Sequence, residues 1–573
     1  MTSPMAAAAS PGVNDRKPWL KSYPPGVPAT IDESRLGTLA DLFRDSIARY
    51  ADRPAVESFG KRQTYAELGA TADAVAAWLQ TRRLEKGDRV AIMLPNVMAY
   101  PAILFGVLIS GFTVVNVNPL YTARELTHQL KDSGARVLFV LENFCHTVEE
   151  ALPNLDLDEV VVVTPGDLMG LKGVIVNFVS RRMKKAVKPF RLLESATFAS
   201  VVEANRGKTS KPVAIGRDEV AFLQYTGGTT GVAKGAVLRH RNVAANLEQV
   251  RVWMADYIGE RPDHVMVAAL PLYHIFALTV CGLLMCRIGG CLLLIANPRD
   301  IPGFVTTLKS RPFTLMSGVN TLYNALVKNP GLKEVDFSQV RLCISGATTT
   351  QAAVAQRWKD ITGKKICEGY GLSETSPVVS ANRLDDEQEF TGTIGYPLPS
   401  TEVSIRAVDN NRVLPPGEPG ELCVKGPQVM AGYWQRPDET AKVTTSDGFF
   451  RTGDIAVMQP DGSLKIVDRI KDMVLVSGFN VYPNEVEEVL AAHPGVLEVA
   501  VIGVPDAHSG EMVAAYIVRK DDNLSEADLR AFCNDRLTGY KIPRRVVFRD
   551  SLPKTPVGKV LRRELRDEVL GKK

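Results

Sequence analysis

The sequence predicts a protein of mixed α/β and α+β class, with a large N-terminal domain and a small C-terminal domain. The chain has 573 residues, which is more than one hydrophobic core usually organises. Helical and strand patterns alternate in its first third, whereas short strands between turns dominate from Thr391 onward. After Lys471 a compact tail has helices and strands of its own. We therefore predict domains at 1–470 and 471–573.

The first third predicts layered α/β structure. Thr64 and Glu67 have capping-box spacing and open an alanine-rich helix that we expect to reach about Arg83, and the spacing recurs at Thr122 and Glu125. Around these helices lie the apolar segments RVAIML, AYPAILFGVLIS, FTVVNV and RVLFV. Strands separated by helices indicate parallel sheets.

The later chain predicts a β-rich subdomain and then an α+β domain. Turn pairs separate the short strands ELCVKG and SLKIVD; they are Pro416-Gly417, Pro419-Gly420, Asp447-Gly448 and Asp461-Gly462. The tail contains two helical segments, NEVEEVLAAH and SEADLRAFCNDRL, and three strand segments, VAVIGV, VAAYIVR and RVVFRD. That content is sufficient for an independent domain.

Composition excludes several classes of protein. The net charge of +4 is nearly neutral for this length, and it gives no support for a nucleic-acid partner, which would need a clustered basic stripe. The eight cysteines form no CxxC pair, so we expect buried free thiols in a reducing compartment. The N-terminus does not read as a secretory signal. The charge-free stretch 90–123 is interrupted by proline and glycine too often for a membrane helix. We therefore expect a cytoplasmic protein.

The strongest local motif is YTGGTTGVAKGA, residues 225–236. Its small and hydroxyl residues, followed by a lysine, can wrap phosphate oxygens with backbone amides and side chains. It is not a Walker A loop, because Lys234 is followed by glycine. A flexible surface hairpin is the structural alternative. The candidate phosphate ligands are Thr226, Gly227, Gly228, Thr229, Thr230, Gly231 and Lys234.

Three further motifs carry candidate chemistry. In EGYGLSET, residues 368–375, Gly371 allows close backbone approach and Glu374 offers an oxygen ligand for Mg²⁺, although a solvated glutamate is an equal alternative. Asp454 in RTGD and Arg469 in DRIKD could hold a ribose, although aspartates after glycine are usually turn residues. Lys559, in LPKTPVGKVLRRE, could neutralise a phosphoryl centre or be a plain exposed lysine.

In this order and spacing the four motifs resemble the adenylate-forming superfamily of acyl-CoA synthetases, luciferases and peptide-synthetase adenylation domains. The resemblance runs from about Leu39 to Glu564, and it is greatest to bacterial long-chain fatty-acid–CoA ligases. Segments outside the motifs carry this finer likeness, among them WLKSYPPGVPATID, NVNPLYTARELTHQL, LPLYHIFALT, GVNTLYNAL and SGFNVYPNEVE.

The resemblance implies ATP-dependent activation of a fatty acid to an acyl-adenylate with release of pyrophosphate, followed by thioester formation with CoA. It assigns phosphates to the loop 226–234, Mg²⁺ to Thr229 and Glu374, and the ribose to Asp454 and Arg469. It assigns contacts with and around the adenine to Gly346, Ala347, Tyr370, Gly371 and Thr375. Lys559 would bridge the α-phosphate and the attacking carboxylate, and His274 would lie beside them, although an isolated histidine on an apolar stretch is more often a core residue.

The resemblance also implies movement and an acyl pocket. Lys471 would be the hinge about which a mobile C-terminal domain swings, bringing the CoA-channel residues Ser477, Gly478 and Phe479 to the site. Gly318 and Val319, with apolar residues after His274, are candidates for the acyl pocket.

The sequence leaves open the partners of the protein and two rival functions. The segment 172–188 is apolar at its start and basic at its end, so it could contact an anionic membrane peripherally or form a solvated helical face over the core. The sequence does not decide whether the chain forms a homodimer. The rivals are a fatty-acyl-AMP ligase that loads a carrier protein and a fatty-acid binding or uptake protein.

Overall fold

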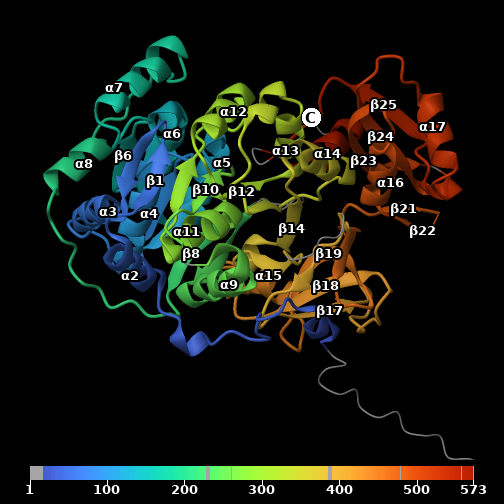
Figure 1. Ribbon diagram of the computed structural model, residues 1–573, viewed down its shortest axis with the longest axis horizontal. Coiled ribbons are helices and arrows are strands. Elements are labelled where there is room, and N and C mark those ends of the chain that lie inside the picture. The colour runs from blue at the N-terminus through green and yellow to red at the C-terminus, as the bar shows by residue number, and fades with distance from the viewer. Residues whose placement is uncertain are drawn as a thin grey trace, which may run out of the picture.

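The computed structural model describes residues 17–226, 233–259, 261–384, 390–477, 479–506, 508–555 and 558–571. Figure 1 shows their arrangement, with the C-terminal elements lying beside α13 and α14. Four sheets organise these residues, two large and two small. The predicted mixed α/β and α+β architecture is confirmed.

The first sheet is parallel except for its last pair, β8 and β9. Across the sheet its strands are β7 (Ala196–Thr197), β6 (Glu159–Val163), β5 (Ala135–Leu141), β3 (Arg89–Met93), β4 (Thr113–Asn116), β8 (Val220–Thr226) and β9 (Lys234–Arg239). The helices of this part are α2 (Leu39–Tyr50), α3 (Tyr65–Leu79), α4 (Ala99–Ile109), α5 (Ala123–Ser133), α6 (Cys145–Ala151), α7 (Leu171–Phe178) and α8 (Phe198–Ala204).

Both predicted capping boxes are present. Thr64 and Glu67 cap α3, and Thr122 and Glu125 cap α5. Helix α3 ends at Leu79, before the expected Arg83, because the chain turns there and Arg82 leaves the helix to pair with Glu159. The charge-free stretch 90–123 forms strand, buried helix and strand, as predicted. Within the described residues, no helix is long and apolar enough to span a membrane.

The second sheet is the larger one. Its strands in spatial order are β16 (Tyr396–Pro397), β15 (Val378–Ala381), β14 (Ile366–Gly371), β13 (Leu342–Ser345), β12 (Leu315–Gly318), β10 (Val265–Ala268), β11 (Cys291–Leu294), β1 (Pro54–Ser58) and β2 (Lys61–Thr64). Its helices are α9 (His240–Trp253), α10 (Ala255–Ile258), α11 (Leu284–Ile288), α12 (Ile301–Ser310), α13 (Asn320–Val327) and α14 (Ala352–Thr362).

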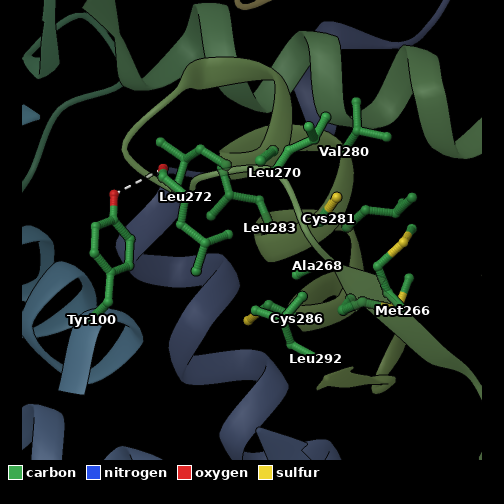
Figure 2. Packing of buried hydrophobic residues seen from close by; sticks show 14 of the residues in the cluster. Tyr100, Met266, Ala268, Leu270, Leu272, Val280, Cys281, Leu283, Cys286 and Leu292 are labelled. Carbon is green, nitrogen blue, oxygen red and sulfur yellow. Dashed lines mark hydrogen bonds between the residues drawn. The ribbon is translucent and has the colours of Figure 1, made fainter. Parts of the chain in front are cut away.

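The core joins the two large sheets. Figure 2 shows Tyr100 of α4 donating a hydrogen bond to the backbone oxygen of Leu272, at 2.9 Å, beside apolar residues of β10, α11 and β11. All eleven residues of α4 are buried because the helix lies between the layers. The eight cysteines are free and buried, as predicted.

The two small sheets lie after Thr391, where the sequence changes to short strands between turns. The antiparallel third sheet comprises β17 (Glu402–Arg406), β18 (Gly420–Lys425), β19 (Phe450–Met458) and β20 (Leu464–Arg469), with α15 (Pro437–Lys442) nearby in the chain. The fourth comprises β22 (Phe479–Val481), β21 (Val474–Val476), β24 (Gly510–Arg519), β23 (Val496–Asp506) and β25 (Arg545–Arg549), with α16 (Pro483–Ala491), α17 (Glu526–Asn534) and α18 (Arg562–Val569).

Short 3₁₀ and π segments complete the described elements. They are the 3₁₀ turns η1 (Pro18–Ser22), η2 (Glu33–Arg35), η3 (Glu142–Phe144), η4 (Leu152–Asn154), η7 (Pro330–Glu334), η8 (Ser373–Thr375) and η9 (Gly539–Lys541), and the π turns η5 (Val179–Met183) and η6 (Ala277–Leu283). The residues of the fourth sheet have a hydrophobic core of their own, on both of its faces. The division at 470/471 itself stays a prediction.

Candidate active site

A large cavity collects most of the predicted site residues. Its volume is 1820 Å³, larger than the ~300–1,000 Å³ of a typical small-molecule pocket. The predicted residues on its wall are Thr226, Lys234, His274, Gly346, Ala347, Tyr370, Gly371, Glu374, Asp454, Arg469, Lys471 and Lys559. They come from both large sheets, the third sheet and the C-terminal segment, so the cavity lies where these parts meet. It has room for more than one ligand.

The ends of the phosphate loop reach this cavity. Thr226 and Lys234 are paired across the antiparallel strands β8 and β9. The Lys234 ammonium pairs with Glu439 and lies 5.3 Å from the centroid of the Tyr433 ring. The predicted ligands Gly227, Gly228, Thr229, Thr230 and Gly231 lie outside the described residues, as does Gly478.

Glycines at the carboxyl ends of β13 and β14 let the backbone pack closely at the cavity wall. A Cβ on Gly371 would lie 1.9 Å from the Pro377 carbonyl oxygen, so only glycine fits there. A Cβ on Gly346 would lie 3.0 Å from the Phe276 ring. Ala347 has a left-handed φ of +63°. Both turns follow the carboxyl ends of neighbouring parallel strands, where open α/β sheets bind ligands.

Asp454 and Arg469 are opposite each other on β19 and β20. The Arg469 Nε lies 3.2 Å from Asp454 Oδ1, and Tyr370 donates its hydroxyl to Asp454 Oδ2 at 2.6 Å. Burial, reinforced by the neighbouring Asp454 charge, holds the pKa of Tyr370 well above its usual range, so its phenol remains a donor. These contacts fix the carboxylate at the cavity wall.

Glu374, the predicted magnesium ligand, lies on the cavity wall. Tyr433 donates its hydroxyl to Glu374 Oε1 at 2.8 Å, and burial raises the pKa of the carboxyl. The described part of the chain has no group of three or more His, Cys, Asp or Glu side chains that could hold a metal by themselves. Mg²⁺ usually takes one or two protein oxygens together with substrate phosphates and water.

Lys559 is presented to the cavity by a turn of the C-terminal segment. Its backbone N–H donates to Thr555 Oγ1 at 3.0 Å, and its carbonyl accepts from the Thr555 N–H at 2.7 Å. A Cβ on the preceding residue, Gly558, would lie 2.2 Å from Thr321 Oγ1 of α13, so this turn rests closely on the large N-terminal part. Lys559 thereby reaches the same cavity as His274 and Asp454.

Burial and neighbouring charges lower the pKa values of Lys559, His274 and Lys471. Removal from bulk water, reinforced by the Arg469 charge and opposed by Asp454, lowers the pKa of Lys559 to about 7. Burial and the Lys559 charge lower the pKa of His274 to about 4, so the imidazole is neutral at pH 7. Burial and Arg469 also lower the pKa of Lys471. Lys559 and Lys471 both feel the charge of Arg469, so this part of the wall favours an anionic ligand.

Several predicted residues do not line this cavity. Thr375 is buried, and its hydroxyl accepts from the Leu372 N–H at 3.0 Å. Phe479 is 58% exposed and stacks on Tyr540 at a centroid distance of 5.0 Å. The remaining three are Ser477, Gly318 and Val319, which also lie off the wall. Their predicted roles stay predictions.

Sequence reasoning missed an apolar part of the wall. Val250, Trp253 and Met254 follow one face of α9 and its end at helical spacing. Other apolar wall residues come from distant segments: Leu342, Ile344, Leu384 and Leu398. Of the residues after His274, Ile275, Phe276 and Val280 lie on the wall, and their place in an acyl pocket stays a prediction. The helical spacing on α9 was visible in the sequence, but it equally suits a core-facing helix.

Buried Glu368 is a further wall residue that the motif analysis left without a role. Its Oε1 accepts from the Thr350 N–H at 3.1 Å, and burial raises its pKa to about 7.

Two family models match the chain. That of the AMP-binding enzymes matches residues 43–434, and that of the AMP-binding enzyme C-terminal domain matches residues 485–559. The chain belongs to the AMP-binding enzyme family. The second match ends at Lys559, so the two matches of this AMP-binding enzyme include wall residues from both its N-terminal and its C-terminal part.

Similar proteins cover this AMP-binding enzyme nearly end to end. A long-chain-fatty-acid–CoA ligase of Escherichia coli O6:H1 is 52% identical over 560 residues, covering 97% of this chain and 99% of the relative. Proteins of the same name from Haemophilus influenzae and Bacillus subtilis are 46% and 37% identical, each covering 97% of this chain and 99% of the relative.

Solved structures share the fold. ATP-bound MatB from Rhodopseudomonas palustris superposes with a TM-score of 0.80 at 30% identity, covering 92% of this AMP-binding enzyme and 98% of that chain. The anthranilate CoA ligase AuaEII in complex with anthranoyl-AMP has a TM-score of 0.83 at 24% identity, covering 95% and 99%. The second likeness shows the fold alone.

Proposed function

We propose that this protein is an AMP-forming long-chain-fatty-acid–CoA ligase. One observation carries the chemistry: a single cavity holds the ends of the phosphate loop, Glu374, the Asp454–Arg469 pair and Lys559. The identity of 52% to a long-chain-fatty-acid–CoA ligase over nearly the whole chain supports the substrate class. ATP, a fatty acid and CoA are the co-substrates.

In the first half-reaction a fatty-acid carboxylate attacks the α-phosphorus of ATP and pyrophosphate leaves. Both reactants are anions, so the main demand on the site is charge neutralisation. Lys234 would exchange Glu439 for the β- and γ-phosphates. Lys559 would bridge the carboxylate and the α-phosphate; its pKa of about 7 would rise as these anions arrive. Asp454, with Arg469, would accept the ribose hydroxyls.

Mg²⁺ would be held by Glu374 and by Thr229, and would supply further neutralisation of the phosphate charge. Tyr370, Gly371, Gly346 and Ala347 would flank the adenine, and the neutral His274 could donate one N–H to the carboxylate or a phosphate. We do not assign His274 as a general base, because a carboxylate nucleophile is already ionised at pH 7.

In the second half-reaction the CoA thiol attacks the acyl carbon and AMP leaves. The observed arrangement has Lys559 on the cavity wall and Ser477 and Phe479 away from it. We propose that rotation about Lys471 withdraws Lys559 and brings Ser477, Gly478 and Phe479 to the acyl-adenylate. The acyl chain would occupy the apolar wall, with Gly318 and Val319 behind it.

The assay that tests the proposal uses purified protein with MgATP and palmitate, with and without CoA. AMP and palmitoyl-CoA should form together only with all components present. Adenylate that accumulates without a CoA thioester would instead indicate a fatty-acyl-AMP ligase for a carrier protein. Tight palmitate binding without ATP turnover would indicate a binding or uptake protein.

We place the enzyme in the cytoplasm with peripheral membrane contact. Its oligomeric state is a separate question, and sedimentation velocity would test for a homodimer.

A further inference from the structure

Both ends of the phosphate loop contact one short segment, residues 432–439, which lies outside the predicted motifs. At its start the Val237 N–H donates to the Gly432 carbonyl at 2.9 Å, and the Trp434 N–H donates to the Gly235 carbonyl at 2.8 Å. The segment therefore runs along β9 and then enters α15. These backbone hydrogen bonds fix its position relative to the loop.

A hydrogen bond and an ion pair connect the first end of the loop to Arg436. Tyr225, directly before Thr226, donates its hydroxyl to Asp132 Oδ2 on α5 at 2.7 Å. The Arg436 Nη2 donates to Asp132 Oδ1 at 2.6 Å. The Arg436 side chain is 38% exposed and lines the cavity, whereas the Asp132 side chain is 15% exposed. Asp132 therefore holds the guanidinium at the cavity wall, on the side of the phosphate loop.

The second end of the loop contacts the same segment one helical turn further along. Lys234 pairs with Glu439, and Glu439 also accepts a hydrogen bond from the Lys442 Nζ at 2.6 Å. All three side chains line the cavity. When phosphates replace Glu439 as the partner of Lys234, the Glu439 carboxylate keeps Lys442 as its counter-ion. The segment therefore leaves no unpaired carboxylate beside the phosphates.

The charge of the leaving group calls for a further cation here. The loop 225–236 contains one basic residue, Lys234, whereas pyrophosphate leaves ATP with several negative charges. A guanidinium presents five N–H donors in a planar fork that matches phosphate oxygens. The contact with Asp132 is made through Nη2, and a guanidinium in such a contact still has donors for a second anion.

We propose that Arg436 is a phosphate-binding residue that contacts the β- or γ-phosphate of ATP and the departing pyrophosphate, and that Asp132 positions it. The inference rests on the proposed function and extends it to a residue outside the motifs. In adenylation the carboxylate oxygen bonds to the α-phosphorus while the bond from that phosphorus to the bridging oxygen breaks. The electron pair of the broken bond stays with pyrophosphate, and Arg436 stabilises this charge.

Equilibrium dialysis of MgATP and of AMP, without fatty acid, distinguishes phosphate binding from a structural ion pair. Arg436→Gln should bind MgATP about tenfold more weakly than wild type, because it loses a charge-assisted contact. It should bind AMP within about twofold of wild type, because AMP has no β- or γ-phosphate. Arg436→Lys keeps the charge and loses the fork, so it should regain only part of the MgATP affinity.

Arg136→Gln is the matched control. The Arg136 side chain is 37% exposed and pairs with Asp158 at 2.6 Å, but it lies off the cavity wall. This variant should bind both nucleotides like wild type. It should also unfold at a temperature similar to that of Arg436→Gln, since each loses one ion pair of similar exposure. If Arg436→Gln unfolds far lower, Arg436→Lys carries the test, and its equal affinity with wild type for MgATP would overturn the inference.

Exchange of labelled pyrophosphate into ATP, with palmitate and without CoA, measures the leaving group itself. Arg436→Gln should raise the KM for pyrophosphate about tenfold. Palmitoyl-CoA formation from supplied palmitoyl-adenylate and CoA should stay within about twofold of wild type, because no pyrophosphate takes part in that step. Equal weakening of MgATP and AMP binding, or unchanged MgATP binding in both Arg436 variants, would overturn the inference and leave Arg436 as a structural partner of Asp132.

The inference and the proposed function can fail separately. A wild type that binds MgATP but makes no palmitoyl-CoA would refute the ligase, and the dialysis comparison would still decide the role of Arg436. Normal palmitoyl-CoA formation, with the same MgATP affinity in wild type and Arg436→Gln, would refute only the phosphate contact.

Discussion

Replacing Lys559 by alanine should slow adenylation far more than thioester formation. In the observed arrangement this lysine shares the cavity with Asp454 and Arg469, and its charge is felt by His274. A charge-assisted contact contributes ~1.5–3 kcal/mol. If Lys559 makes that contact only in the adenylation transition state, its loss should cost ~10–100-fold or more in rate.

The two half-reactions can be assayed separately. Pyrophosphate release with MgATP and palmitate reports the first, and palmitoyl-CoA formed from supplied palmitoyl-adenylate and CoA reports the second. Lys520→Ala, an exposed lysine of the same C-terminal part, serves as the matched control and should leave both rates unchanged. Equal loss of both half-reactions in Lys559→Ala would refute the assignment.

The same lysine predicts a pH dependence. The protonated form is the useful one, and burial lowers its pKa to about 7. Since kcat/KM reports ionisations of the free enzyme, kcat/KM for MgATP should fall as pH rises through about 7. Lys559→Arg keeps its charge over this range, so the fall should disappear even if the overall rate is lower. A fall of the same midpoint in Lys559→Arg would assign it to another group.

Three further substitutions test the cavity. Glu439→Gln removes the present partner of Lys234 and should lower the KM for ATP by about two- to fivefold, the effect of one surface-type ion pair; a raised KM would mean that Glu439 itself aids binding. Trp253→Ala enlarges the apolar wall and should shift kcat/KM toward longer acyl chains by roughly tenfold, since one methylene in an apolar pocket is worth ~1–3 kcal/mol. An unchanged chain-length profile would place the acyl chain elsewhere. Asp468→Asn weakens a fully buried carboxylate, which accepts a hydrogen bond from the Asn484 N–H at 2.7 Å and faces Arg562. We expect the adenylation rate to fall about fivefold and the thioester-forming rate to be spared. An equal fall in both rates would show a general loss of stability.

The order of the elements and their types were predictable from local sequence. Capping-box spacing at 64–67 and 122–125 fixed where two helices begin, because the side chains that satisfy a helix N-terminus lie within one turn of it. The charge-free stretch 90–123 read correctly as strand, helix and strand because its prolines and glycines interrupt any long helix. Helix ends were less certain, as α3 showed.

The site was predictable as a set of residues but not as a place. Long segments separate the motifs at 226–234, 368–375, 451–454, 468–472 and 552–564. Their resemblance to the family predicted that they share one site. Only the fold places Asp454 opposite Arg469 through the register of β19 and β20, and Lys559 beside both. Tyr433 and Glu439, which hold Glu374 and Lys234, lie outside every motif.

The sequence by itself determined the family, the reaction class and twelve of the residues on the cavity wall, because those depend on residue types at short, local spacings. The tertiary structure decided which predicted residues share one cavity, the pKa values of Lys559 and His274, and the apolar wall on α9, because burial and charge depend on contacts between distant segments. It also decided which way α7 faces. The periodicity of 171–178 predicts an amphipathic helix whichever side is outward, and only the packing of Gly173 against Gly166 turns its apolar face to solvent.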